Sequence, residues 1–188
     1  MKWCLKYSAI AKIVLAIGTL ILSSCQNSGY ITPATQAIDA KLNSFAAEGD
    51  VNFSHSGRYL VYTSDRARKR SVYLYDLQRQ RLISLPGINQ PGSMQSQADV
   101  SADGRYIVYC SEQLGKTDIY LYDRSTAKSK NITQNFIGEV RRPSVSGNGR
   151  FIAFEGNRSG QWDIEIYDQG TGTELSAPQN FNVAPPAP

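Results

Sequence analysis

A segment of 45 to 47 residues occurs three times in this chain, and this repeat limits the possible fold more than any other feature. Each copy has a Gly-Arg-aromatic turn, an apolar run, and a second run that ends in Tyr-Asp. The turn glycines are Gly57, Gly104 and Gly149, and the final aspartates are Asp76, Asp123 and Asp168. Glycine and aspartate are 19 residues apart in every copy. A repeat of this length is typical of one blade of a β-propeller.

The apolar runs predict strands that are covered on both faces. Residues 59–62 and 106–109 are apolar at every position instead of alternating with polar residues. Such a strand is buried on both sides, and a blade achieves this by packing on a neighbouring blade at each face. The Ser-Gly, Asp-Gly and Asn-Gly pairs are typical of tight turns between strands. We therefore predict an all-β fold of three four-stranded antiparallel blades, which is a partial propeller. In the first copy the expected strands are 51–54, 58–64, 71–77 and 81–85.

A short helix is predicted before the repeats. Ala34, Ile38, Leu42 and Phe45 follow Pro33 at spacings of four, four and three residues, which is a helical period. We assign the 188 residues to four parts. A signal peptide (1–24) is followed by a lipidated leader with the helix (25–48), three repeats (49–176) and a proline-rich tail (177–188). The three copies of the repeat lie at about 51–85, 98–133 and 143–176.

The N-terminal residues indicate where in the cell the protein is located. Lys2 and Lys6 precede a short apolar run, residues 13–22. Ten residues cover about half of a ~30 Å hydrocarbon core, so a signal peptide is favoured over a spanning helix. The run ends in Leu-Ser-Ser-Cys25, which resembles a bacterial lipobox and implies a lipid anchor on Cys25 that faces the periplasm. Gln26 then favours the outer membrane. The alternative is an ordinary secretory signal with a coincidental cysteine.

Charge and residue counts narrow the function. The net charge is +4, but removal of the signal peptide leaves 17 basic against 16 acidic residues, without the basic excess of a nucleic-acid binder. One histidine and three cysteines disfavour a zinc site, and we expect no metal, no cofactor and no catalytic residue. His55 aligns with Ala102 and Gly147, so it is predicted to be a turn residue. Cys110 is predicted to be a small core residue.

Two hairpin loops carry the candidate binding residues. The first loop is basic, with Arg68 where the other copies have glycine, and its cations are Arg66, Arg68, Lys69 and Arg70. It fits a phospholipid headgroup, lipopolysaccharide or an acidic partner, the alternative being a solvated loop. Trp162 lies in the corresponding loop of the third copy, either as an exposed contact residue or packed over the blade edge.

The copies resemble the TolB-type propeller repeat, a relative of the WD-type blade. The resemblance rests on the Ser-x-x-Gly-Arg-aromatic turn, on Ser64-Asp65-Arg66 and on Ile-Tyr-Leu-Tyr-Asp at 119–123, and it covers about 49–176. The layout is also similar to small cyanobacterial lipoproteins described as TolB-like. The resemblance implies a non-catalytic, membrane-anchored envelope protein that binds or scaffolds a protein partner. The alternatives are a glycan- or peptidoglycan-binding module and an accessory propeller subunit of an envelope enzyme.

Three blades are fewer than the four to eight of a closed propeller. A homodimer could combine two copies into six blades, another protein could supply the missing surface, or three blades could form an open unit with capped ends. Glu165 stands where the other copies have Tyr73 and Tyr120, which predicts a more polar, solvent-facing last blade. The predicted helix would cap the other end.

Overall fold

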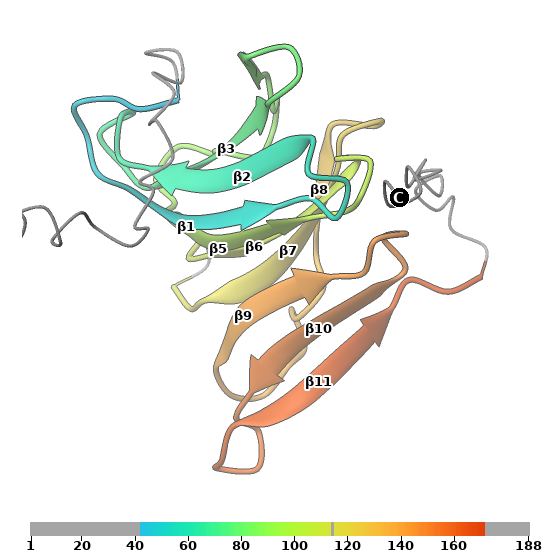
Figure 1. The fold of residues 1–188 in the computed structure, drawn as a ribbon. Coiled ribbons are helices and arrows are strands. Elements are labelled where there is room, and N and C mark those ends of the chain that lie inside the picture. The colour runs from blue at the N-terminus through green and yellow to red at the C-terminus, as the bar shows by residue number, and fades with distance from the viewer. Residues whose placement is uncertain (1–41, 114, 172–188) are drawn as a thin grey trace, which may run out of the picture. The chain divides into compact units, whose positions relative to one another are not determined.

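The described residues form three antiparallel β-sheets joined by turns and loops (Figure 1). The computed structural model describes residues 42–113 and 115–171. The chain divides into two units, residues 1–36 and 37–188, and every described residue lies in the second unit. Within the described segments no helix is long and apolar enough to cross a membrane.

The sheets are named blades 1, 2 and 3, and their strands follow one another in chain order. Blade 1 contains β1 (Glu48–Phe53), β2 (Tyr59–Ser64), β3 (Ser71–Asp76) and β4 (Arg81–Ile83). Blade 2 contains β5 (Gln95–Val100), β6 (Tyr106–Ser111), β7 (Asp118–Asp123) and β8 (Lys128–Asn131). Blade 3 contains β9 (Val140–Val145), β10 (Phe151–Gly156) and β11 (Asp163–Asp168).

This architecture confirms the predicted all-β partial propeller. The fourth strand expected in the third copy would fall on residues 172–176, outside the described residues. The predicted N-terminal helix also lies outside them, except for residues 42–45, which form turns and bends instead of a helix. The signal peptide, Cys25 and the proline-rich tail lie outside the described residues as well.

The blades pack face to face through the apolar runs. Strands β2 and β6 are buried at all six positions, as the unbroken apolar runs predict. One cluster joins blades 1 and 2, with Val61 and Leu74 against Ile107 and Tyr109. A second joins blades 2 and 3, and its buried members are Tyr106, Val108, Leu121, Val145 and Ile152. The core therefore lies between the sheets, and each blade contributes one face to each neighbour.

The residues that define the repeat close each blade at one end. The arginine after the turn glycine donates to the final aspartate in every copy, at 2.9 Å for Arg58–Asp76 and Arg150–Asp168 and 3.0 Å for Arg105–Asp123. These pairs tie the start of the second strand to the end of the third. The turn glycines Gly57, Gly104 and Gly149 have positive φ angles of 68°, 73° and 81°, which favour glycine.

Glu165 occupies a different face from the one that the sequence indicated. It pairs with Phe154 across β10 and β11, and Phe154 packs in a cluster with Cys110 of blade 2. The Glu165 side chain is only 16% exposed and forms an ion pair with Arg158. The prediction that Glu165 faces solvent in the last blade is therefore wrong. The exposed face of this blade carries Ile164 and Ile166 instead.

Candidate binding surface

The hairpins β2–β3, β6–β7 and β10–β11 surround two adjoining hollows, which together are called the hairpin face. The first hollow has a volume of about 620 Å³ and lies between blades 1 and 2, with Arg68 and Met94 in its wall. The second has a volume of about 540 Å³ and lies between blades 2 and 3, with Trp162 in its wall. Ser96 and Glu112 line both hollows. The fold therefore places the basic loop and Trp162 at one continuous surface.

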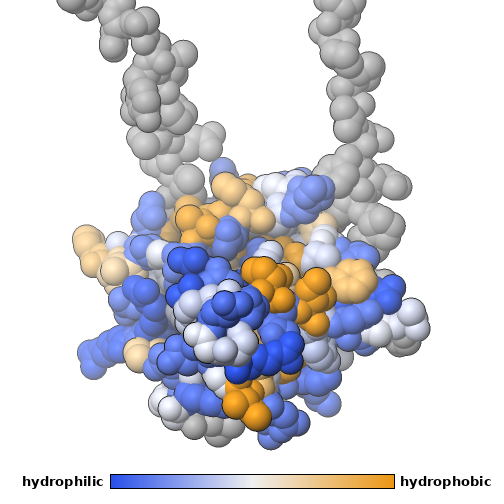
Figure 2. All heavy atoms as spheres, turned by 90° about the horizontal axis from the view of Figure 1, so that it is seen from below, coloured by the Kyte–Doolittle hydropathy of each residue, from blue (hydrophilic) through white to orange (hydrophobic). Residues whose placement is uncertain are grey.

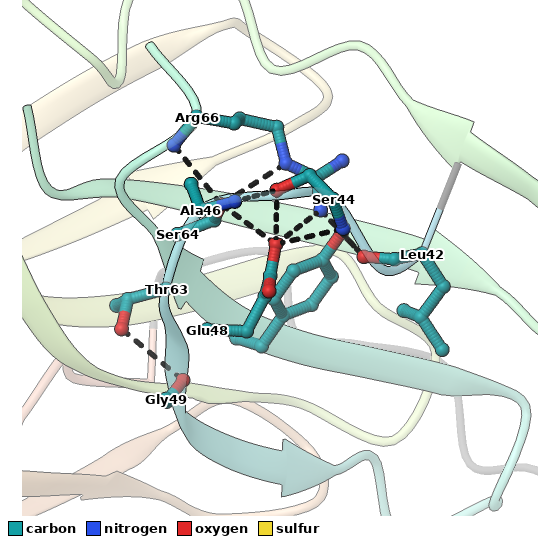
Figure 3. A network of polar contacts seen from close by, with 9 residues as sticks. Leu42, Ser44, Ala46, Glu48, Gly49, Thr63, Ser64 and Arg66 are labelled. Atoms are coloured by element: carbon teal, nitrogen blue, oxygen red, sulfur yellow. Dashed lines mark hydrogen bonds and ion pairs between the residues drawn. The ribbon is translucent and has the colours of Figure 1, made fainter. Parts of the chain in front are cut away.

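Arg66 lines neither of the two hollows. Contacts within the protein hold its side chain (Figure 3). Its guanidinium donates to Glu48 at 3.0 Å and to the carbonyl oxygen of Leu42. It also stacks over the rings of Tyr62 and Tyr73, at 5.6 Å and 4.8 Å from their centroids. These contacts tie the segment before β1 to the first hairpin, which is a structural role.

Glu48 is the centre of the same network. Ser44 Oγ donates to its carboxylate at 2.6 Å, and Ser64 Oγ does so at 3.1 Å. The hydrogen bond from Ser44, together with those from Arg66 and Ser64, outweighs the effect of burial and lowers the pKa of Glu48 below its ordinary value. Glu48 therefore stays ionised at neutral pH and holds Arg66 in place.

The other three cations of the basic loop line the first hollow. Lys69 donates to the carbonyl oxygens of Asn89 and Gln90. Arg70 forms an ion pair with Asp65 at 3.2 Å, in which both side chains are partly exposed. Arg68 is exposed and has a φ angle of 63°, at the position where the other hairpins have glycine. Arg68 is thus the cation of this loop that is best placed to meet a ligand.

Trp162 forms one wall of the second hollow and is supported by Arg141. The Arg141 guanidinium lies 3.8 Å from the centroid of the indole ring, within the range of a cation–π contact. Arg141 also forms an ion pair with Glu155, at 2.6 Å. The hydrogen bonds from Arg141 and Arg142 lower the pKa of Glu155, so this carboxylate is ionised at neutral pH. Trp162 remains 38% exposed, so its ring is both oriented and accessible.

Sequence reasoning missed two components of this surface. Met94 is exposed between the basic loop and Glu112, in the connection that leads into blade 2. Glu112 follows β6 and contributes to both hollows. Neither belongs to a recognisable motif, and only the stacking of the blades brings them beside Arg68 and Trp162.

The remaining candidates have structural positions. Cys110 is buried between blades 2 and 3, and burial raises the pKa of its thiol to about 12, which confirms a core residue. His55 is exposed in the β1–β2 turn, as predicted, at the opposite end of the strands from the hairpin face. Among residues 42–113 and 115–171, no group of three or more His, Cys, Asp or Glu side chains could hold a metal ion.

Solved structures share this fold, whereas no protein-family model and no curated protein matches the chain. TolB from Acinetobacter baumannii is 24% identical with a TM-score of 0.50, over 68% of this chain and 31% of that one. A putative TolB from Agrobacterium tumefaciens is 24% identical with a TM-score of 0.50, over 73% of this chain and 49% of that one. This chain therefore spans less than half the length of these TolB chains.

A third similar structure corrects one prediction. An oligogalacturonate lyase from Vibrio parahaemolyticus has a TM-score of 0.50 at 14% identity, over 67% of this chain and 36% of that one. Because the same fold occurs in an enzyme, the prediction that this chain is not an enzyme is overturned. Neither the fold nor the lack of a familiar catalytic motif decides whether the chain is catalytic. What the comparisons do establish is the architecture, since the three blades of this chain have the fold of TolB-like β-propellers.

Proposed function

We propose that this chain is a membrane-anchored protein of the bacterial envelope whose hairpin face binds a protein partner. The observation that carries the proposal is the pairing of Trp162, oriented by Arg141, with Arg68 and Met94 in the adjoining hollow. Trp, Met and Arg are enriched where proteins bind one another, and Trp and Arg supply most of the residues that dominate affinity. The TolB-like fold supports a role in the envelope.

The partner should present an acidic segment with an apolar side chain. Arg68 is exposed and offers a cation without an internal ion pair among the described contacts. Met94 and Trp162 offer apolar surface on either side of Glu112. An acidic residue beside Arg68 and an apolar one against Trp162 would use both hollows, and the flanking Glu112 would disfavour a partner of uniform negative charge.

The experiment is cross-linking of the full-length protein in its own cells, followed by identification of the joined protein. Trp162→Ala and Arg68→Glu should each reduce the cross-linked product at least about tenfold, as expected for residues that dominate an interface. Arg79→Glu is the matched control, because Arg79 is exposed in the β3–β4 turn at the other end of the strands. An unchanged product in both hairpin-face variants would overturn the proposal.

A glycan ligand gives a different result in the same variants. Retention of the purified protein on peptidoglycan, abolished by Trp162→Ala in the absence of any other protein, would replace the protein partner by a glycan. Identification of an envelope enzyme as the cross-linked partner would instead define this chain as an accessory subunit.

Anchoring has its own test. Cys25→Ser should release the protein from the membrane fraction and remove the acyl mass from its N-terminal peptide, because Cys25 is the predicted lipidation site. Membrane association that persists in Cys25→Ser without an acylated peptide would contradict the lipid anchor.

A further inference from the structure

Aromatic side chains and glycines meet in the same way at both blade interfaces of this chain. The first residue of the second strand in each blade is aromatic, and these residues are Tyr59, Tyr106 and Phe151. The Tyr59 ring lies so close to Gly104 that a Cβ atom there would be 2.7 Å from it. The Tyr106 ring covers Gly149 in the same way. Gly104 and Gly149 therefore each receive the aromatic ring of the preceding blade.

One aromatic ring and one turn glycine of this series have no packing partner of this kind among the described residues. Phe151 is 42% exposed, whereas Tyr59 and Tyr106 are buried. Gly57 has the same positive φ as the other turn glycines, but a Cβ atom there would meet no atom within 4 Å. The chain thus has an exposed aromatic ring at one end of the stack and an uncovered glycine at the other.

The strands around Phe151 have the apolar composition of an inter-blade face. Ile164 and Ile166 are 70% and 68% exposed, although the equivalent residues of blade 2, Ile119 and Leu121, are buried against blade 3. A hollow of about 480 Å³ between Phe151, Ala153 and Ile166 adjoins them. Figure 2, which views Figure 1 from below and so from the blade 3 end, shows strongly apolar side chains amid a mostly hydrophilic surface. This face has the character of a surface that packs against another blade.

The opposite end of the stack has the matching features. Val51 and Phe53 of β1 are exposed, whereas their equivalents in blade 2, Ala98 and Val100, are buried against blade 1. Val51 lines a hollow of about 230 Å³ together with Leu42, Leu60 and Tyr62. Val51 and Phe53 therefore form an exposed apolar part of this face of blade 1, whereas Leu60, Tyr62 and Tyr75 are buried in a cluster with Leu42.

Hydrogen bonds between the inner strands also link each blade to the next. The inner strand of each blade has a bulge residue with positive φ, and these are Asp50, Gln97 and Arg142. The Asp50 carboxylate accepts from the Gln97 N–H at 3.1 Å, and the Gln97 side chain accepts from the Arg142 N–H at 2.6 Å. The series ends at Arg142, because a guanidinium offers no acceptor for the next backbone N–H.

We propose that two copies of this chain pair head to tail, with blade 3 of each packing on blade 1 of the other. Phe151 of one copy covers Gly57 of the second, and Ile164 and Ile166 are buried. Two such interfaces close a ring of six blades, within the range of closed propellers. This pairing goes beyond the proposed binding function and does not depend on it, because the hairpin face is not part of the contact.

A pair of cysteines tests the contact directly. The Ala102 Cβ atom lies 3.7 Å from the position that a Cβ atom on Gly147 would occupy, across the interface of blades 2 and 3. This separation suits a disulfide. By the repeat, Gly147 of one copy should stand in the same relation to His55 of the second. The full-length His55→Cys/Gly147→Cys variant, oxidised in detergent, should form a covalent species of twice the chain mass that reducing agent splits.

Two sets of variants control this experiment. The single variants His55→Cys and Gly147→Cys should give no covalent dimer. In the ring, neither residue lies beside the same residue of the second copy. Ala102→Cys/Gly147→Cys should form a bond within one chain, which verifies the geometry on which the design rests. A covalent ladder of three and more chains would overturn the closed ring, and dimers in the single variants would overturn the assigned contact.

A charge substitution tests the apolar face. Ile166→Glu should raise the dissociation constant of the dimer at least about 100-fold in sedimentation experiments, because an unpaired carboxylate would be buried. Ile137→Glu is the matched control, since Ile137 is also exposed but lies in the connection before β9. A wild-type mass of one chain at all concentrations would overturn the pairing. So would an unchanged dissociation constant in Ile166→Glu, or cross-links from Ile166 to residues beyond 171 of its own chain.

Discussion

Burial separates the three Arg–Asp pairs at the scale of single residues. The Asp76 side chain is 2% exposed and that of Asp168 is 40% exposed. Burial alone would raise the pKa of Asp76, but hydrogen bonds from Arg58 and from the backbone of Arg79 and Gln78 outweigh it and lower the pKa. The hydrogen bonds from Arg150 and the Gly170 N–H lower the pKa of Asp168 to about 2. Solvent screens the exposed pair, so the repeated motif stabilises the first blade more than the last.

This difference predicts a pH-dependent effect of Asp76→Asn. A lowered pKa in the folded state stabilises the protein above the unfolded value of about 4, and that stabilisation is lost as the pH falls through the folded pKa. At pH 7 the substitution should lower the free energy of unfolding by about 2 kcal/mol, and the deficit should shrink at pH 3. Urea unfolding at both pH values measures it, with Asp168→Asn as the milder control. An equal loss of unfolding free energy in both variants would contradict the stronger stabilisation by the buried Arg58–Asp76 pair.

At the scale of elements, the strands were predictable because turns and apolar runs determine them locally. The expected strands 58–64 and 71–77 correspond to β2 and β3 within one residue at each end. The bulges in the inner strands were not predictable, since Gln97 and Arg142 have no preference for positive φ. Hydrogen bonds from the adjacent blade accompany these conformations, and such contacts have no local signature.

The same limit applies to the candidate site. The basic loop and Trp162 could be located from the sequence, because they depart from the repeat. The internal role of Arg66 could not, since its partner Leu42 precedes the first strand and its partner Glu48 begins it. The outward direction of Ile164 and the inward direction of Glu165 depend on which face of blade 3 has a neighbour, and composition does not determine that.

Two glycine substitutions measure the packing between elements. Gly149→Ala should destabilise the fold by the strain of a positive φ, about 1 kcal/mol, and by about 1–3 kcal/mol more from the clash with the Tyr106 ring. Gly57→Ala in the Ile166→Glu background has the same strain without a clash, so it is the matched control. Thermal unfolding of both variants in that background gives the difference. Equal destabilisation would show that the ring shifts at no cost.

At the scale of the whole molecule, Cys110 can report whether the stack unfolds as one unit. Cys110 packs against Val140 and Phe154 between blades 2 and 3. Burial raises the pKa of its thiol from its ordinary value to about 12. At pH 8 iodoacetamide should therefore alkylate the native protein roughly 1000-fold more slowly than the unfolded chain.

The measurement follows labelling by mass spectrometry across a urea series, with Ile137→Cys as an exposed reference thiol. Labelling should rise together with the loss of β-structure, because nearest-neighbour packing stabilises each blade. Labelling at lower urea concentrations than the main transition would show instead that blade 3 separates first.

The order of strands in each sheet also has a consequence for how the protein reaches its native state. Every strand in the described segments pairs with its neighbour in the chain, so these three sheets form from local pairings. Loop-closure entropy is small for such local pairings, and low contact order favours rapid folding. A blade can complete its own hairpins while the next one is still being synthesised. Such vectorial folding shortens the time for which unpaired strand edges are exposed to aggregation.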